Sequence, residues 1–235
     1  MLVTKSGLAE SRERAQALIL AGKVRVKGET VRRPDRTVDD DAQIAVDAEP
    51  GYASRGALKL APALDAFGVD PAGRVCADIG ASTGGFTDVL LRRGAARVYA
   101  VDVGRGLMHW RLRQDPRVVL MERVNARELE SFPESVSLVV IDVSFISLDR
   151  ILPAVRLAAP GAEVVALFKP QFEVGRAEVG KRGVVRDQSA IDAALDRFRA
   201  WCAANGYQVI DQAPSEVAGA EGNREVFVHL EPATA

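Results

Sequence analysis

Between Val75 and Lys169 the sequence alternates short apolar runs with amphipathic segments, and this alternation constrains the fold more than any other feature. Each apolar run is rich in valine, leucine, isoleucine or alanine and ends at a charged residue, as buried strands can do. Strands that alternate with helices form a parallel, doubly wound sheet. The expected strands are Val75 to Asp78, Val98 to Asp102, Val118 to Arg123, Leu138 to Asp142 and Val164 to Lys169.

The amphipathic segments have the apolar periodicity of helices that cover such a sheet. In one of them Phe86, Val89 and Leu90 fall on the same face, and in another Pro153 requires the helix to kink or to begin there. The expected helices are Gly56 to Phe67, Gly84 to Arg93, Leu148 to Ala159 and Gln188 to Asn205.

Two closing strands complete this part of the chain, Tyr207 to Gln212 and Glu225 to Leu230, and Gly222-Asn223 between them resembles a hairpin turn. The predicted fold class is α/β, a Rossmann-like and mostly parallel sheet of about seven strands whose last strand is antiparallel. The 235 residues, 48% apolar and 27% charged, suffice for this domain and a small second one. This composition excludes a disordered or fibrous chain.

The first fifty residues have the pattern of a separate, compact α+β unit. Glu49-Pro50-Gly51-Tyr52 then breaks all periodicity. We therefore expect an N-terminal domain at residues 1–50, a linker at 51–54 and the main domain at 55–235. The expected elements of the first unit are a helix that Ser11 caps, that runs through Leu20 and that Gly22 ends, strands at Val24 to Val26 and at Ala42 to Val46, and a turn at Lys27-Gly28-Glu29.

Charge is distributed unevenly along the chain. The net charge of -1 argues against a globally basic nucleic-acid binder, yet cations crowd the N-terminal unit. They predict a local site for a polyanion, and the alternative is a solvated charged face. These cations are Lys5, Arg12, Arg14, Lys23, Arg25, Lys27, Arg32, Arg33 and Arg36.

Two cysteines, Cys76 in an apolar strand and Cys202 beside Trp201, form neither a disulfide framework nor a metal cluster. Buried thiols in a reducing cytosol are expected. The chain does not open with a basic segment followed by an apolar run, and no apolar stretch approaches the ~20 residues of a membrane helix. We expect a cytoplasmic protein that binds no membrane, DNA or metal.

The segment Asp78 to Gly85, D-I-G-A-S-T-G-G, joins the first strand to the helix after it. Ligands of doubly wound sheets bind at the carboxyl ends of strands, so this loop is placed for binding. Gly80, Gly84 and Gly85 permit positive φ and close backbone approach, and the amides that open the next helix can donate to a polar ligand group. The pattern lacks G-x-G-x-x-G and a following Gly-Lys-Ser/Thr, which disfavours a dinucleotide or ATP.

Two further strand ends narrow the expected ligand to S-adenosylmethionine. Asp102 ends the second strand, where a carboxylate usually binds ribose hydroxyls, and Asn125-Ala126 ends the third, within reach of an adenine. The alternative is a glycine turn with a purely structural role. The residues expected to bind the cofactor are Asp78, Gly80, Ala81, Ser82, Thr83, Gly84, Gly85, Phe86, Asp102, Val103, Asn125, Ala126 and Asp142.

Charged residues end the fourth and fifth strands, where Asp142 and Lys169 should emerge over the reactive end of the cofactor. Lys59, before the first strand, and Glu225, at the start of the last, could converge there. Burial beside another cation lowers the pKa of a lysine and carboxylates orient it, so this group suits deprotonation of a ribose hydroxyl. The alternative is that each residue forms an ordinary surface salt bridge.

Five segments at these places carry a family resemblance: S-R-G-A-L-K-L (Ser54 to Leu60), D-I-G-A-S-T-G-G-F-T-D (from Asp78), I-D-V-S-F-I-S-L (Ile141 to Leu148), F-K-P-Q-F-E (Phe168 to Glu173) and G-N-R-E (Gly222 to Glu225). Together they resemble the TlyA-type, or haemolysin A-type, rRNA 2′-O-methyltransferases over nearly the whole chain. Those enzymes share a Lys-Asp-Lys-Glu tetrad with FtsJ-type methyltransferases. The resemblance places it on Lys59, Asp142, Lys169 and Glu225, with Lys169 as the base, and implies methylation of a cytidine ribose.

The N-terminal unit is similar to an S4 RNA-binding domain, on the run S-R-E-R-A-Q-A-L-I-L-A-G-K-V-R-V-K-G (Ser11 to Gly28). Its first helix is expected to be short, which resembles the family's shorter subtype, with large-subunit rRNA as the expected target, whereas the longer subtype also modifies the small subunit. The expected partners are rRNA or ribosomal subunits. The expected RNA contacts are Arg12, Arg14, Lys23 and Lys27, then Arg55, and Lys181, Arg182 and Arg186 in the loop Gly175 to Arg186.

Two other functions fit parts of the sequence. A catalytically silent RNA-binding or ribosome-assembly factor would keep the cofactor only structurally, but the complete tetrad favours an enzyme. The haemolysin name implies membrane lysis, yet amphipathic helices such as Gln188 to Asn205 are what the cover of a sheet requires. His109 and His229 lie on different elements and are expected to be core or surface residues.

Overall fold

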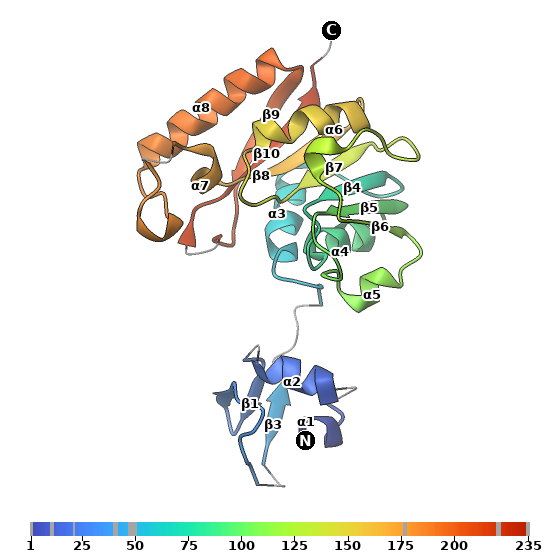
Figure 1. Ribbon diagram of the computed structural model, residues 1–235, viewed down its shortest axis with the longest axis vertical. Coiled ribbons are helices and arrows are strands. Elements are labelled where there is room, and N and C mark those ends of the chain that lie inside the picture. Colours follow the sequence, from blue (N-terminus) through green and yellow to red (C-terminus); the bar gives the residue numbers. More distant parts are fainter. Residues whose placement is uncertain are drawn as a thin grey trace. The chain divides into compact units, whose positions relative to one another are not determined.

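The computed structural model describes residues 2–9, 12–20, 22–39, 42–46, 51–175, 178–219 and 222–233. Its internal contacts divide the chain into two units, Met1–Gly51 and Tyr52–Ala235. The predicted cap Ser11 lies outside the described residues. The second unit holds alternating strands and helices, and Figure 1 shows its sheet with helices packed against it.

A seven-stranded sheet forms the centre of the second unit, in the order β6-β5-β4-β7-β8-β10-β9. Strands β4 to β8 are parallel to one another, whereas β10 is antiparallel to both β8 and β9. This confirms the predicted Rossmann-like sheet with an antiparallel last strand. The strands are β4 (Val75–Ile79), β5 (Arg97–Asp102), β6 (Val118–Glu122), β7 (Leu138–Ile141), β8 (Glu163–Phe168), β9 (Tyr207–Pro214) and β10 (Val226–Pro232).

Helices cover both faces of this sheet, and successive strand residues alternate between two apolar clusters. Cys76 and Val140 belong to one cluster, and their neighbours Ala77 and Val139 belong to the other. Burial on both faces explains why the strands form almost continuous apolar runs in the sequence. The helices are α3 (Ala57–Phe67) and α4 (Gly85–Arg92) on the first face, and α6 (Leu152–Ala158) and α8 (Gln188–Ala204) on the second.

Cys76 and Cys202 are both buried and free, which confirms the expectation of buried thiols. Within the described residues, the structure has no helix that is both long enough and apolar enough to cross a bilayer.

Short helical turns lie in the connections that follow several strands, namely α5 (Trp110–Arg113), η1 (Ala126–Glu128), η2 (Leu148–Arg150), α7 (Pro170–Glu173) and η4 (Lys181–Gly183).

The segment that was expected to form one helix at residues 148–159 is divided in two. The turn η2 ends at Arg150, and α6 begins at Leu152. Pro153 therefore lies in the first turn of α6, where the N–H that proline lacks has no helical partner to lose. This is one of the two outcomes that the sequence allowed.

The tight hairpin turn predicted at Gly222-Asn223 is wrong, although β9 and β10 do pair as antiparallel neighbours. Strand β9 extends to Pro214 and β10 begins at Val226, so the connection between them is longer than a two-residue turn. Gly222, at φ 88°, closes a turn within this loop by donating its N–H to the Gly219 carbonyl at 3.1 Å. A glycine and asparagine pair indicates a turn, but it does not fix the length of the connection.

The first unit combines two helices, α1 (Leu2–Lys5) and α2 (Arg12–Leu20), with a three-stranded antiparallel sheet of order β2-β1-β3. Strands β1 (Val24–Val26) and β3 (Ile44–Val46) match the expected positions. Strand β2 (Glu29–Val31) was not predicted, because two of its three residues are polar and exposed. The apolar core of the first unit contains Ala15, Leu18 and Val24.

Candidate functional site

The loop between β4 and α4 needs glycine at two positions. Gly80 has φ 85° and Gly84 has φ 91°, both in the left-handed region. A β-carbon on Gly80 would collide with the carbonyl oxygen of Asp142, and one on Gly84 would collide with Met108 and Leu112. Glycine thus allows the end of β4 to approach the end of β7 beside the N-terminus of α4.

Asp78 is fully buried near the end of β4. Its Oδ2 accepts a hydrogen bond from the Thr87 hydroxyl at 2.6 Å, whereas its Oδ1 is buried without a partner among the described residues. Burial is the main cause that raises the pKa of Asp78 to about 7, and the negative charges of Asp142 and Asp102 raise it further. A buried acceptor without a donor is costly, so this atom indicates a donor that arrives with a ligand.

Two cavities open around this loop, and both are lined by Gly80, Ser82 and Asp142. Their volumes of about 760 Å³ and about 500 Å³ are those of small-molecule sites. Of the residues expected to bind the cofactor, Asp78 and Gly84 line neither cavity. The others line the larger (Asp102, Val103, Asn125, Ala126), the smaller (Ala81, Thr83, Gly85, Phe86) or both.

The backbone orients two polar side chains in the larger cavity. Asp102 accepts hydrogen bonds from the Ser82 N–H at 2.8 Å and from the Gly104 N–H at 2.7 Å. Asn125 Oδ1 accepts the Arg127 N–H at 3.2 Å. Each carboxylate oxygen of Asp102 has a second lone pair, so Asp102 can still accept hydrogen bonds from ligand hydroxyls.

The four charged residues at the strand ends form two ion pairs. Lys59 Nζ lies 2.6 Å from Glu225 Oε2, and their side chains are 15% and 2% exposed. Lys169 Nζ lies 2.6 Å from Asp142 Oδ1, and it donates a hydrogen bond to Ser144 Oγ at 3.0 Å. Lys59 and Lys169 thus each have a carboxylate oxygen 2.6 Å from Nζ.

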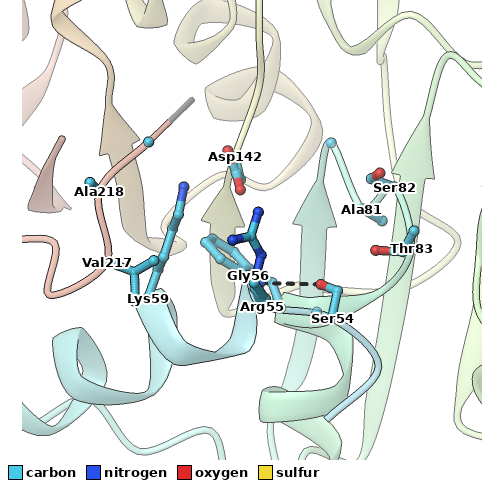
Figure 2. A pocket seen from close by; sticks show the side chains of 14 residues that line it. Ser54, Arg55, Gly56, Lys59, Ala81, Ser82, Thr83, Asp142, Val217 and Ala218 are labelled. Atoms are coloured by element: carbon cyan, nitrogen blue, oxygen red, sulfur yellow. Dashed lines mark hydrogen bonds between the residues drawn. The ribbon is translucent and has the colours of Figure 1, made fainter. Parts of the chain in front are cut away.

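Lys59 and Asp142, one member of each pair, line the smaller cavity. Figure 2 shows Lys59 and Arg55 rising toward Asp142 on one side, with the loop of Ala81, Ser82 and Thr83 on the other. One member of each ion pair therefore lines a cavity next to the glycine loop, whereas Lys169 and Glu225 line neither of the two cavities. Such an arrangement can hold a hydroxyl group and accept its proton beside a bound cofactor.

Sequence reasoning missed Phe145, which follows Asp142 and Ser144 in the loop after β7. Its side chain is 91% exposed, and its backbone is left-handed at φ 66°. Its ring lies 5.3 Å from that of Phe172, and it lines the larger cavity. An aromatic residue held in a left-handed conformation and facing outward is unusual and points to a role in binding.

Glu173 was also missed. It accepts the Leu148 N–H at 2.9 Å, and this bond joins α7, which follows Lys169, to η2, which follows Asp142. Burial is the main cause that raises the pKa of Glu173 to about 7, and Asp149 adds to the effect. It ends the segment F-K-P-Q-F-E that carries part of the family resemblance, but the sequence analysis gave it no role of its own.

The expected RNA contacts lie in different places. Arg55 lines the smaller cavity, and Arg182 and Arg186 are exposed on the loop between α7 and α8. In the first unit Arg12 is exposed, Lys23 is half-buried, and Lys27 forms an exposed ion pair with Asp39 at 3.2 Å. The side chains of Arg14 and Lys181 lie outside the described part of the structure.

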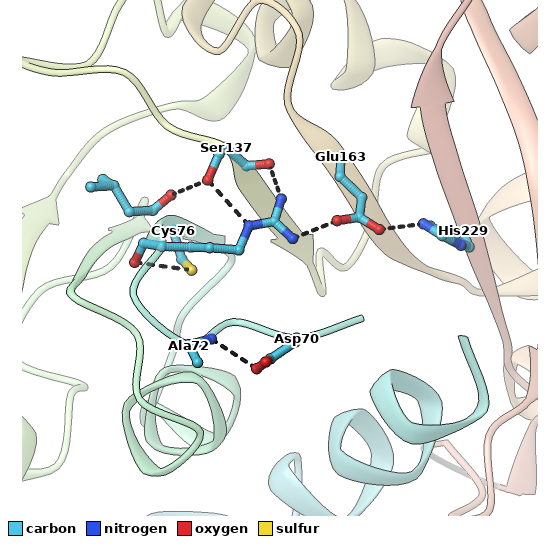
Figure 3. A network of polar contacts seen from close by, with 8 residues as sticks. Asp70, Ala72, Cys76, Ser137, Glu163 and His229 are labelled. Atoms are coloured by element: carbon cyan, nitrogen blue, oxygen red, sulfur yellow. Dashed lines mark hydrogen bonds and ion pairs between the residues drawn. The ribbon is translucent and has the colours of Figure 1, made fainter. Parts of the chain in front are cut away.

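A second polar cluster lies at the amino ends of the parallel strands (Figure 3). Arg74 pairs with Glu163 Oε2 at 2.5 Å and donates to Ser137 Oγ at 3.2 Å, while His229 Nε2 lies 2.7 Å from Glu163 Oε1. The hydrogen bond from His229 is the main cause that lowers the pKa of Glu163, and Arg74 lowers it as well. Ligating atoms of Glu163, His229 and Glu231 come within 4.8 Å of one another, but both Glu163 oxygens already have partners.

Neither histidine lines the two cavities. His109 lies at the start of α5, where its Nδ1 accepts the Arg111 N–H at 3.3 Å. The ring of His229 stacks on Phe67 with a centroid separation of 5.3 Å. These contacts of the two histidines are with residues that line neither cavity.

Comparison with known proteins relates this geometry to a family. Residues 52–231 match the FtsJ-like methyltransferase model, and residues 1–44 match the S4 domain model. The 16S/23S rRNA (cytidine-2′-O)-methyltransferase TlyA of Mycobacterium tuberculosis is 47% identical over 99% of this chain and 88% of its own. Hemolysin A of Brachyspira hyodysenteriae is 40% identical over 97% of both chains. A solved structure from Streptococcus thermophilus, described provisionally as a hemolysin, is 44% identical, with a TM-score of 0.79 over 100% of this chain and 87% of that one.

Proposed function

This chain belongs to the FtsJ-like methyltransferase family, and we propose that it transfers a methyl group from S-adenosylmethionine to the 2′-oxygen of a cytidine ribose in rRNA. The target proposed is large-subunit rRNA. The observation that carries this proposal is that Lys59 and Asp142, one member of each ion pair, line a cavity that adjoins the glycine loop. The cytidine and the rRNA are proposed from the name of the Mycobacterium tuberculosis relative.

The residues around the glycine loop fit S-adenosylmethionine. The unpartnered Oδ1 of Asp78 would accept a hydrogen bond from the cofactor's ammonium group, which supplies the donor that this buried oxygen lacks. Asp102 would bind the ribose of the cofactor, and the cavity beside Asn125 and Ala126 would hold its adenine. When bound, the cofactor supplies an electrophilic methyl group on a sulfonium.

The chain's own residues would activate the accepting oxygen. Lys169 in its neutral form would take the proton of the ribose hydroxyl at Nζ, while the new carbon–oxygen bond forms and the bond from methyl carbon to sulfur breaks. Asp142 and Ser144 orient Nζ, since both contact it. The Lys59–Glu225 pair would form the opposite wall of the site and position the ribose of the cytidine.

The S4 unit would supply RNA affinity through phosphate contacts. Phosphate contacts position a folded RNA without reading its sequence, and exposed Arg12 and Lys27 are suited to them. The same role is proposed for Arg55 at the mouth of the smaller cavity. Ribosomal subunits in the cytoplasm would then be the substrate.

The test is transfer of a tritiated methyl group from S-adenosylmethionine to isolated ribosomal subunits, followed by mapping of the modified nucleotide. The wild-type protein should label a ribose 2′-oxygen of the large subunit. Lys169→Ala should keep cofactor affinity and lose transfer by about 10²- to 10⁴-fold, the usual contribution of a general base. Undiminished transfer by this variant would contradict the assignment of the base, and cofactor binding without transfer by the wild type would favour a silent RNA-binding factor.

A further inference from the structure

Asn223 joins two loops that are far apart in the sequence. Its side-chain Oδ1 accepts the Val185 N–H at 3.0 Å, and its Nδ2 donates to the Gly183 carbonyl at 2.9 Å. The residue is 3% exposed, so water competes little for these bonds. The loop between α7 and α8 is therefore fastened to the loop that precedes β10, and Figure 1 shows these two segments side by side.

The second of these loops also places Glu225, two residues after Asn223. Glu225 is buried and pairs with Lys59, and its carbonyl accepts the Ser215 N–H at 2.9 Å. A β-carbon on Gly219 would collide with the Glu225 carboxylate, so this loop packs closely over the ion pair. Asn223 therefore fixes the position of the loop between α7 and α8 relative to the Lys59–Glu225 pair.

What Asn223 holds is a strained turn that carries two arginines. Arg182 has φ 68° and Gly183 has φ 74°, so two successive residues are left-handed, which an arginine does not adopt without external support. Arg182 and Arg186 are exposed and line a hollow of about 490 Å³. Among the described residues, neither arginine has an acidic partner.

The two acids that line the same hollow are engaged elsewhere. Glu178 accepts the Gly175 N–H at 2.7 Å, and Asp187 caps α8 by accepting the Ser189 N–H at 2.9 Å. The guanidinium groups of Arg182 and Arg186 therefore remain available for an anion. Planar guanidinium groups match the oxygens of a phosphodiester.

We propose that Asn223 is a positioning residue that fixes Arg182 and Arg186 as a phosphodiester-binding surface for the substrate strand, in register with the Lys59–Glu225 pair. The inference rests on the proposed function, because it takes the substrate to be RNA. It assigns Asn223 a part in substrate affinity and none in the transfer of the methyl group.

Asn223→Ala removes both hydrogen bonds, and Asn223→Asp keeps the acceptor for Val185 while losing the donor to Gly183. Loss of two buried bonds should raise KM for ribosomal subunits about tenfold with kcat within about twofold, and Asn223→Asp should raise KM at least as far, because its buried carboxylate would face the Gly183 carbonyl oxygen. Asn205→Ala is the matched control, since Asn205 is exposed and its side chain bonds only to the Trp201 carbonyl of its own helix in the described structure. A fall in kcat at unchanged KM would overturn the proposal.

A double-mutant cycle tests whether Asn223 acts through the arginines. Arg182→Gln with Arg186→Gln should raise KM and lower the slope of log affinity against log salt by about 0.7 for each phosphate of the single strand that the variant no longer neutralises. Adding Asn223→Ala to this background should then raise KM less than twofold, whereas an undiminished tenfold effect would overturn the proposal.

Hydrogen exchange of the protein alone tests the anchor without RNA. The Val185 amide should exchange at least tenfold faster in Asn223→Ala than in the wild type, and equal rates would overturn the proposal. This measurement stands even if ribosomal RNA is not the substrate. A wild-type protein that methylates no ribosomal RNA would instead contradict the proposed function.

Discussion

The central sheet carries a charged cluster at each of its two ends, and the two clusters are built differently. At the amino ends of the parallel strands, Arg74, Glu163 and His229 satisfy one another. At the carboxyl ends, Lys59 and Asp142 line a cavity of about 500 Å³, next to a second cavity of about 760 Å³. Ion pairs of similar length thus occur in a closed network and around an open space.

The difference shows which features indicate a site. Short ion pairs occur in both clusters, so charge alone does not separate function from stability. The carboxyl-end cluster adds a glycine loop, a cavity and the unpartnered Oδ1 of Asp78. The amino-end cluster leaves Glu163 without a free oxygen. We therefore propose a catalytic role for the cluster at the carboxyl ends and a stabilising role for the cluster at the amino ends.

A matched pair of glutamate substitutions should give the largest contrast. Glu225→Ala leaves Lys59, whose side chain is 15% exposed, without its partner at the cavity, so we expect kcat/KM to fall by about 10²- to 10³-fold. Glu163→Ala breaks an ion pair of the same domain far from the cavities and should change kcat/KM by less than about threefold. Methyl transfer to ribosomal subunits measures both. Equal losses in the two variants would contradict the division between site and scaffold.

Phe145→Ala tests whether the exposed aromatic belongs to the site. Stacking of a base on an aromatic ring contributes about 1–3 kcal/mol, so KM for RNA should rise about five- to one-hundred-fold. The affinity for S-adenosylmethionine, measured by titration calorimetry, should change little because Phe145 is 91% exposed. Phe172→Ala, which removes the neighbouring ring, should give a smaller effect of the same kind. A loss confined to cofactor affinity would place Phe145 on the adenine instead.

The raised pKa of Asp78 predicts how cofactor binding depends on pH. Asp78 must be ionised to pair with the cofactor's ammonium group, and its pKa is about 7 in the free protein. Affinity should therefore be constant above that pH and fall about tenfold for each unit below it. Calorimetric titration from pH 5.5 to 8.5 measures this dependence. Asp78→Asn should bind more weakly at pH 8 and lose the slope, and an unchanged slope in that variant would assign the titration to another group.

The same comparison separates what the sequence predicts from what it does not. The glycine loop and the parallel strands were predicted because each depends on neighbouring residues and on a local period. The longer connection at residues 215–225 and the strand Glu29–Val31 were missed, because pairing with other strands determines them. Local pattern thus predicts the framework better than the edges of the sheets.

The charged residues show the same limit. Their places at strand ends indicated a common edge, but the ion pairs depend on strand order. Lys59 and Glu225 are 166 positions apart, and Glu163 and His229 are 66 apart. Strand β10 lies beside β8, which no local pattern could predict. The roles of Lys59, Asp142, Lys169 and Glu225 in catalysis stay predictions for the experiments above.

The smallest expected effect is the contribution of the amino-end cluster to stability. Glu163→Gln should lower the free energy of unfolding by about 1 kcal/mol at pH 7, because Arg74 and Glu163 are still 24% and 21% exposed to screening water. The folded-state pKa of Glu163 is lowered, so this stabilisation is present above the ordinary pKa of 4.5 and is lost as pH falls through the folded-state value. The difference between variant and wild type should therefore shrink as the pH falls below the ordinary pKa of 4.5. Urea unfolding followed by tryptophan fluorescence measures it in the second unit, since Trp110 and Trp201 both lie there. Glu231→Gln, an exposed neighbour on β10, is the control, and an equal loss in that variant would show that charge near the strand, and not the Glu163 ion pair, is responsible.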